Sequence, residues 1–194
     1  MIATRVRARA RDAVWFGQPV QMADVVVELM SDHPEHFDSA RALLEQYIRL
    51  PDAWERHGGV PVELPEVFSR EIAVFPGSAR PPSGDVVVGV VNGTVVAAGH
   101  IVPAAGSDAC EFKRVFVQSS HRRAGVGARL AGAMIDRAAS LGYGRVLIDV
   151  MPERGGAIAF WERLAFAPCE PYRDYPFAMA FMERRLEHGD VTLP

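Results

Sequence analysis

The sequence has few cysteines, no long apolar run and no excess of positive charge, and each absence excludes a class of protein. Two cysteines, Cys110 and Cys169, cannot form a disulfide framework or an all-cysteine zinc site. We therefore expect a protein of the reduced cytoplasm. No apolar stretch approaches the roughly 18 residues of a membrane-spanning helix. The net charge of −3 argues against nucleic-acid binding through a positive surface.

The composition is that of one folded domain. Of the 194 residues, 49% are hydrophobic and 23% are charged, which excludes a disordered chain. Residues 1–22 are rich in arginine, and we interpret them as an N-terminal extension before a domain over residues 23–190. Residues 24–71 carry eleven acidic residues against four arginines, which fits either a cationic partner or a solvated acidic face.

Hydrophobic spacing predicts a strand and a helix early in the chain. Residues 25–30 are rich in β-branched side chains and predict a strand. Asp38 is the expected N-cap of a helix, because apolar residues then recur at helical spacing as far as Ile48. Six prolines predict that residues 51–84 form a long connection with one short helix near Val67.

The second half predicts alternating strands and helices. An Asn-Gly turn between residues 85–91 and 94–102 predicts a hairpin. Residues 111–117 predict a strand whose alternation places Phe112 and Phe116 on one face. The remaining elements are a helix over 126–141, a strand over 145–150, a helix over 156–164 and a closing strand over 177–186. This order indicates a single mixed α/β domain.

A glycine-rich loop, residues 122–127, lies between the strand and the long helix. Gly125 and Gly127 allow a tight turn whose N–H groups no side chain covers. The start of a helix adds partial positive charge. Arg122 and Arg123 add cations beside these amides. The loop therefore predicts a binding site for a phosphate or pyrophosphate.

A dinucleotide-binding loop fits this segment less well. That motif requires a third glycine, where this chain has Leu130, and it directly follows its strand, whereas seven residues separate Val117 from Gly125. Asp149 lies near the distance expected for a ribose-binding acid. The chain has one strand–helix–strand unit, however, and a dinucleotide fold needs more.

Two motifs in this region resemble the GNAT acyltransferases. Residues 111–117, followed by Arg122-x-x-Gly125-x-Gly127, resemble the strand and Gln/Arg-x-x-Gly-x-Gly/Ala loop of that family. Residues 157–166 resemble its Ala-x-x-x-Tyr-x-x-x-Gly-Phe helix and turn. The resemblance implies a twisted mixed sheet that is splayed between two strands and flanked by helices. It also implies acetyl-CoA as acyl donor, with no metal.

The resemblance assigns the donor site residue by residue. In the family, the phosphates of acetyl-CoA bind the loop amides, and the pantetheine arm pairs with the end of the preceding strand. The matching residues here are Val115, Phe116 and Val117 in the strand and Arg122, Arg123, Ala124, Gly125, Val126, Gly127 and Ala128 in the loop. An N–H at or near Val115 would polarise the thioester carbonyl.

An amine acceptor must lose a proton before it attacks the thioester. Glu111 is the first candidate base, because it lies eleven residues before Arg122, a spacing at which some family members carry a catalytic glutamate. A structural role in a pair with Lys113 or Arg114 is equally open. His100 is the second candidate, because an imidazole suits proton transfer near neutral pH.

The late helix departs from the family pattern. Trp161 stands where the family often uses a tyrosine to protonate the leaving thiolate, and indole cannot act as an acid. Tyr172 or Tyr175 could substitute. Ala165 replaces the family's glycine before Phe166, which predicts a slightly altered turn.

The expected function is direct transfer of an acetyl group from acetyl-CoA to the amine of a small cationic molecule. Two alternatives stay open: a non-catalytic acyl-CoA-binding or interaction module, and a nicotinamide-dinucleotide-binding protein. We expect no nucleic-acid or membrane partner. Members of the family often form dimers, so a homodimer is compatible with the resemblance.

Overall fold

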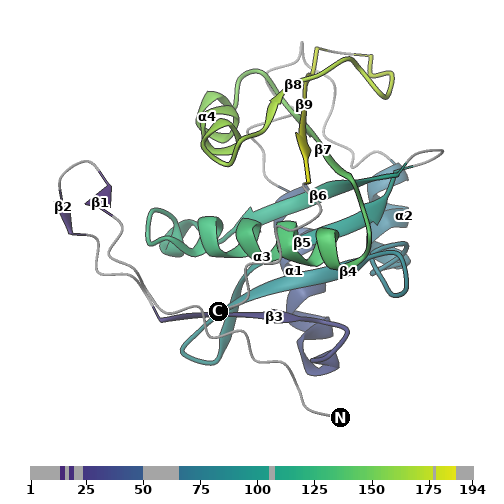
Figure 1. Ribbon diagram of the computed structural model, residues 1–194. Helices are drawn as coiled ribbons and strands as arrows, with labels where there is room; N and C mark the ends of the chain where they lie inside the picture. Colours follow the sequence, from purple (N-terminus) through teal and green to yellow (C-terminus); the bar gives the residue numbers. More distant parts are fainter. Residues whose placement is uncertain are drawn as a thin grey trace.

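The computed structural model describes residues 14–15, 18–19, 24–49, 66–104, 108–176 and 178–186. Its centre is a seven-stranded sheet in the order β3-β4-β5-β6-β7-β9-β8 (Figure 1). The strands are β3 (Val25–Leu29), β4 (Asp85–Val91), β5 (Thr94–Pro103), β6 (Ala109–Val117), β7 (Arg145–Val150), β8 (Ala167–Pro168) and β9 (Ala180–Arg185). The helices are α1 (Phe37–Ile48), α2 (Glu66–Ala73), α3 (Val126–Ser140) and α4 (Gly155–Arg163), with short 3₁₀ turns η1 (Pro34–His36) and η3 (Ser119–His121).

All neighbouring strands are antiparallel except β6 and β7, which are parallel. A parallel pair needs a crossover, and α3 provides it between β6 and β7. The sheet is therefore mixed and the helices flank it, which confirms the predicted mixed α/β class.

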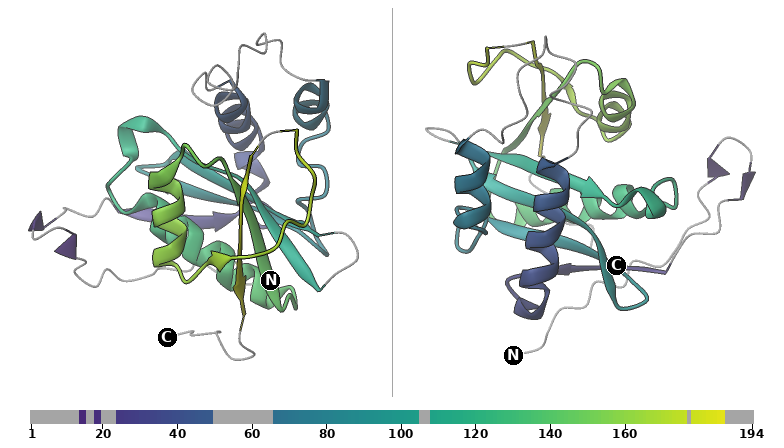
Figure 2. Two further views of the ribbon diagram at one scale, coloured as in Figure 1. Left: turned by 90° about the horizontal axis from the view of Figure 1, so that it is seen from above. Right: turned by 180° about the vertical axis from the view of Figure 1, so that it is seen from behind.

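Helices cover both faces of the sheet. Helix α3 packs Leu130 and Met134 into one core together with α4, while α1 packs Leu43 and Leu44 into a second core on the opposite face. Figure 2 shows α1 and α2 side by side on that second face, away from α3. No helix among the described residues is both long enough and apolar enough to cross a membrane.

Most predicted elements of the first half are present. Asn92 and Gly93 have φ values of 50° and 77°, as the predicted tight hairpin turn requires. Helix α2 corresponds to the short helix expected near Val67. Asp38 is not the N-cap: α1 follows directly on η1, so the cap position falls to His36 and Asp38 lies in the first helical turn.

Both ends of the chain lie largely outside the described residues. In the predicted extension, residues 1–22, the structure describes only β1 (Val14–Trp15) and β2 (Gln18–Pro19), which pair with each other. The division into an extension and a domain over residues 23–190 stays a prediction. The closing strand begins at Ala180, and Phe177, its predicted start, lies outside the described residues.

A left-handed residue ends α4. Ala165 has a φ of 61°, and its N–H donates to the carbonyl of Glu162 at 3.0 Å, while the N–H of Phe166 donates to that of Trp161 at 3.1 Å. This is the position where the sequence predicted an altered turn. The turn is instead a normal helix ending that usually employs glycine, and here alanine adopts it at a steric cost.

We expect Ala165→Gly to stabilise the protein by about 0.5–1 kcal/mol, because glycine removes the steric cost of the left-handed conformation. Ala42→Gly, at an exposed position in α1, is the matched control and should destabilise by about 1 kcal/mol. Urea unfolding of both variants measures the difference. Destabilisation by Ala165→Gly would contradict the strain argument.

Candidate functional site

The parallel strands β6 and β7 pair only at their start. Their register runs from Ala109↔Arg145 to Glu111↔Leu147, although both strands continue. Beyond these pairs β6 stays bonded to β5, and β7 to β9, so the two central strands separate. The sheet is splayed where the sequence resemblance implied, and Glu111 lies at the vertex of the gap.

A bulge in β6 follows the last pair with β7. Between Lys113 and Phe116, β6 contains one residue more than the facing segment of β5. Arg114, in this interval, has a φ of 55°. The extra residue reverses the alternation, so Phe112 joins the α3-side core and Phe116 joins the α1-side core. The prediction that Phe112 and Phe116 share a face is therefore wrong.

The glycine-rich loop leaves its amides available. Gly125 is the N-cap of α3 with a φ of 79°, and no side chain caps the helix. Within the part of the chain that the structure describes, the N–H groups of residues 123–128 donate no backbone hydrogen bond. The first helical amides have no partner inside a helix. The loop therefore presents several donors at the positive end of a 15-residue helix.

The loop lies beside the free end of β6. The Nε of Arg122 donates to the carbonyl of Val117 at 3.0 Å, and its guanidinium lies over the ring of Phe116. A Cβ built on Gly127 would lie 3.6 Å from Val117 and 3.9 Å from Phe160. Gly127 thus faces the sheet and α4, whereas Gly125 forms the turn itself.

Glu111 is a buried carboxylate that is only partly bonded. Its Oε2 accepts a hydrogen bond from Arg173 at 2.6 Å and lies 3.5 Å from Nζ of Lys113. Among the described residues its Oε1 has no partner. Asp85 is equally buried but is fully engaged by Ser31, by Arg137 and by a backbone amide. Buried polar atoms are almost always bonded, so the free oxygen of Glu111 makes it a candidate for a functional role.

Burial raises the pKa of Glu111, and the nearby Asp149 carboxylate raises it further, while Lys113 and Arg173 act in the opposite direction. A carboxylate shifted upward in this way is a better proton acceptor near neutral pH than an exposed one. The pairing with Lys113 expected from a structural role is present too, so both interpretations of Glu111 have contacts that support them.

Two tyrosines from the segment after β8 face the same vertex. Tyr175 donates to Asp149 at 2.7 Å, and the ring of Tyr172 packs against Phe181 on β9. The buried hydroxyl of Tyr172 has no partner in the described part of the chain. Burial raises the pKa of Tyr172 and that of Tyr175, the latter to about 12, so both hydroxyls stay protonated.

The opposite wall comes from α1 and α2. Glu71 forms a two-point ion pair with Arg114, at 2.8 and 2.7 Å, and the guanidinium of Arg114 lies over the ring of Tyr47. The guanidinium of Arg154 lies over the same ring. Of the acidic residues in 24–71 that the structure describes, Glu71 contributes its carboxylate to this wall, where it is paired with Arg114.

His100 and Trp161, two residues considered for chemistry, are enclosed by packing. His100 is 4% exposed, lies against Phe75 and has a pKa that burial lowers to about 4. Trp161 is buried against Phe112 and Phe166 in the α3-side core. The indole is therefore a packing group in this protein.

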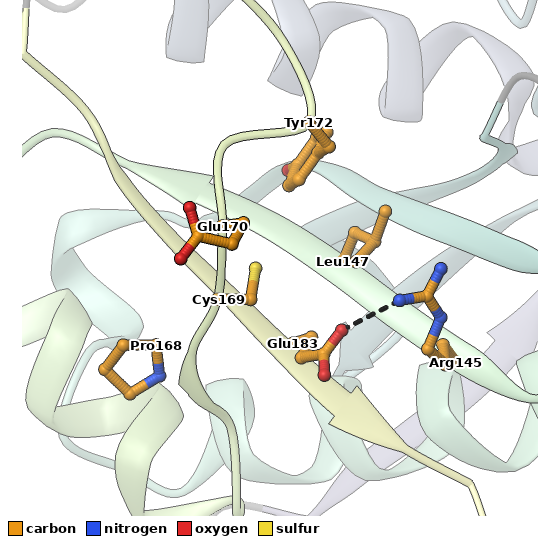
Figure 3. Close-up of a pocket in the computed structure, with 7 residues that line it drawn as sticks. All are labelled: Arg145, Leu147, Pro168, Cys169, Glu170, Tyr172 and Glu183. Atoms are coloured by element: carbon orange, nitrogen blue, oxygen red, sulfur yellow. Dashed lines mark hydrogen bonds and ion pairs between the residues drawn. The ribbon is translucent and has the colours of Figure 1, made fainter.

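A cavity of about 540 Å³ lies on the side of the sheet that Tyr172 covers. Figure 3 shows Arg145 and Leu147 of β7 and Glu183 of β9 on its floor, with Tyr172 at one end. Arg145 and Glu183 form an ion pair across it at 3.0 Å. Its volume lies in the range of small-ligand pockets, and Tyr172 belongs to its lining.

The residues that sequence reasoning missed are Arg173 and Asp149 as partners of this cluster. The sequence signal for Asp149 was the alternation of side chains along the strand 145–150. It places Asp149 on the face opposite Val146 and Ile148. Nothing in the sequence pattern marks Arg173, because it lies in the loop between β8 and β9, whose residues show no periodicity.

The profile of the acetyltransferase (GNAT) family matches residues 40–166. The chain therefore belongs to the GNAT acetyltransferase family, as the two sequence motifs suggested. No curated protein matches the sequence. The match includes β4 to α4, and thus the splay, the loop and the start of the late turn.

Solved structures share the fold at low sequence identity. An N-acetyltransferase from Staphylococcus aureus Mu50 is 17% identical with a TM-score of 0.62, over 85% of this chain and 100% of that one. An acetyltransferase from Streptococcus agalactiae 2603 is 16% identical with a TM-score of 0.63, over 84% and 98%. The yncA protein of Salmonella typhimurium, solved with its cofactor acetyl-CoA, is 18% identical with a TM-score of 0.59, over 84% and 94%.

We expect His100 to make the protein sensitive to mild acid. Its pKa is about 4 when folded and about 6.5 when exposed, so below pH 6.5 the unfolded chain binds a proton that the folded chain rejects. Stability present above pH 6.5 is then lost toward pH 4, by about 2–3 kcal/mol.

Unfolding by urea at pH 7.5 and pH 4.5 tests this, with wild type compared with His100→Gln and His100→Asn. Both variants should lose less stability than wild type between the two pH values. Parallel losses in all three proteins would show that the imidazole does not titrate as argued.

Proposed function

We propose that this protein is an acetyl-CoA-dependent N-acetyltransferase that acetylates the amine of a small cationic molecule. The observation that carries the proposal is the row of unbonded amides at the start of α3, beside the free end of β6. Family membership supports the acetyl donor in general, and the assignments below deepen it.

The loop from Arg122 to Ala128 would bind the diphosphate of the donor, because its amides and the α3 N-terminus favour an anion. The residues Val115 to Val117 would bind the amide-bearing arm like an added strand, since their β7 side lost its strand partner. When bound, the donor supplies a thioester. An N–H at or near Val115 would polarise the thioester carbonyl.

We assign Glu111 as the base that accepts the proton of the acceptor ammonium, directly or through a water molecule. It lies at the vertex, its pKa is raised by burial, and its Oε1 is free for a further contact. His100 was the second candidate. Its imidazole is packed against Phe75, so we favour Glu111. The carboxylates of Glu111 and Asp149 would also attract a cationic amine.

We assign Tyr172 as the residue that stabilises the leaving thiolate, through a hydrogen bond from its hydroxyl. Tyr175 is already bonded to Asp149, and Trp161 has no acidic proton to offer, whereas the buried Tyr172 hydroxyl has no partner among the described residues. Burial raises the pKa of Tyr172, so the hydroxyl stays protonated and would donate a hydrogen bond to the developing thiolate without giving up its proton.

The alternative of a non-catalytic acyl-CoA-binding module rests on Trp161 in place of the usual tyrosine. Release of free CoA thiol, measured with a panel of amines, separates the two readings. Turnover with any amine supports the enzyme, and tight CoA binding without turnover supports the module. Stabilisation by NAD but not by CoA would instead indicate the dinucleotide reading.

Gly125→Asp tests the donor loop. We expect acetyl-CoA affinity to fall on the order of 100-fold, because a carboxylate would stand among the amides assigned to the diphosphate. Gly132→Asp is the control for added negative charge, since it places an aspartate within α3, where a new Cβ meets open space. Gly127→Asp is less suitable, because its side chain would enter the packing between Val117 and Phe160.

Calorimetric titration with acetyl-CoA measures both variants. Equal affinity in Gly125→Asp and Gly132→Asp would remove the loop from the donor site.

Glu111→Gln tests the base. We expect kcat to fall about 100-fold or more, the acidic limb of the pH–rate profile to disappear, and acetyl-CoA affinity to change little. Glu162→Gln, at an exposed position in α4, is the control and should behave as wild type. A rate for Glu111→Gln within about twofold of wild type would make Glu111 a structural residue.

A further inference from the structure

The connection between β3 and α1 brings together three side chains of a kind that bind metal ions. Glu28 lies near the end of β3, His33 directly precedes η1, and His36 ends it. One potential ligand atom from each lies within 4.8 Å of the other two. The cluster is at the start of α1, whereas Tyr47, beside Arg114 in the candidate site, is at its end.

The three side chains are held inward, but solvent still reaches them. The side chains of Glu28, His36 and His33 are 12%, 15% and 18% exposed. Nε2 of His36 lies 2.7 Å from Oε2 of Glu28. The rings of His33 and His36 are stacked with centroids 5.8 Å apart. Small rotations would therefore bring all three donors to one point.

We propose that Glu28, His33 and His36 bind a zinc ion, with water at the fourth position. Two imidazoles and one carboxylate form a common three-ligand set for zinc, and an open fourth position suits a cluster that solvent reaches. A simple ion pair would need only Glu28 and His36. Such an ion pair does not explain why the imidazole of His33, which pairs with Glu35, also stacks on that of His36 within reach of Glu28.

A fourth residue orients the second imidazole. Nδ1–H of His33 donates to Glu35 at 3.0 Å, which assigns Nε2 of His33 to the metal. A carboxylate bonded to the remote nitrogen of a histidine is the usual outer support of a zinc ligand. The side chain of Glu35 is 63% exposed, so we assign it to orienting His33 and not to binding the metal.

No spacing pattern in the sequence pointed to this site. The expectation of no metal came from the family resemblance, and the two cysteines excluded only an all-cysteine site. Glu28 and the two histidines become neighbours only because the turn after β3 folds η1 back along the strand. A bound ion would join the edge strand β3 to the start of α1 and would stabilise the folded chain by mass action.

The test uses the full chain without a histidine tag, stripped by a chelator and dialysed against zinc chloride. We expect one zinc per chain, a visible Co²⁺ spectrum of tetrahedral type and a higher melting temperature with zinc. His33→Ala and His36→Ala should each weaken zinc binding at least about 10-fold, and Glu35→Gln should weaken it about 10-fold. His121→Ala, outside the cluster, is the control.

His33→Ala is the decisive variant, because among the described residues the hydrogen-bond partner of the His33 side chain is the exposed Glu35, so its loss should leave the fold intact. Circular dichroism checks this. Zinc bound at less than one-half equivalent, or equally by wild type and His33→Ala, would overturn the proposal and leave an ion pair between Glu28 and His36. Neither result depends on acetyl-CoA or on amine acetylation.

Discussion

The loss of pairing between β6 and β7 after Glu111 is the constraint on which the candidate site depends. Strand β6 stays paired with β5, and β7 stays paired with β9. Hydrogen bonds are therefore lost only on the sides of β6 and β7 that face the gap. The bulge at Arg114 bends β6 away and redirects its side chains between the two cores. The end of β6 and the start of α3 thereby lie together at the open end of the gap between β6 and β7.

Burial of charge follows from that geometry. A carboxylate at the vertex is enclosed by both strands and by the loop carrying Tyr172 and Arg173, so Glu111 loses water without gaining a full set of partners. An unsatisfied buried group costs about 1–3 kcal/mol. Asp85 is equally buried, but both of its carboxylate oxygens accept hydrogen bonds. Such a local cost is typical of positions retained for chemistry.

The sequence predicted the elements well because each carries its own periodicity, as in the hairpin at Asn92-Gly93 and the stripe of α3. It could not predict the bulge, since one inserted residue leaves no compositional trace, and Phe112 and Phe116 were therefore assigned to a common face. The glycine-rich loop was visible because its backbone demands are local. That Asp149 and Arg173 are partners of Glu111 could not be predicted, because contacts between distant segments follow no spacing rule.

The two edges of the sheet are unequal. At one edge β8 contains only Ala167 and Pro168, and proline has no N–H to offer a further strand. At the other, β3 is longer, but Arg129 already donates to the carbonyl of Val25 at 3.0 Å. Extension of the sheet by another chain is therefore blocked at β8 and obstructed at the first residue of β3, a protection against edge-to-edge aggregation.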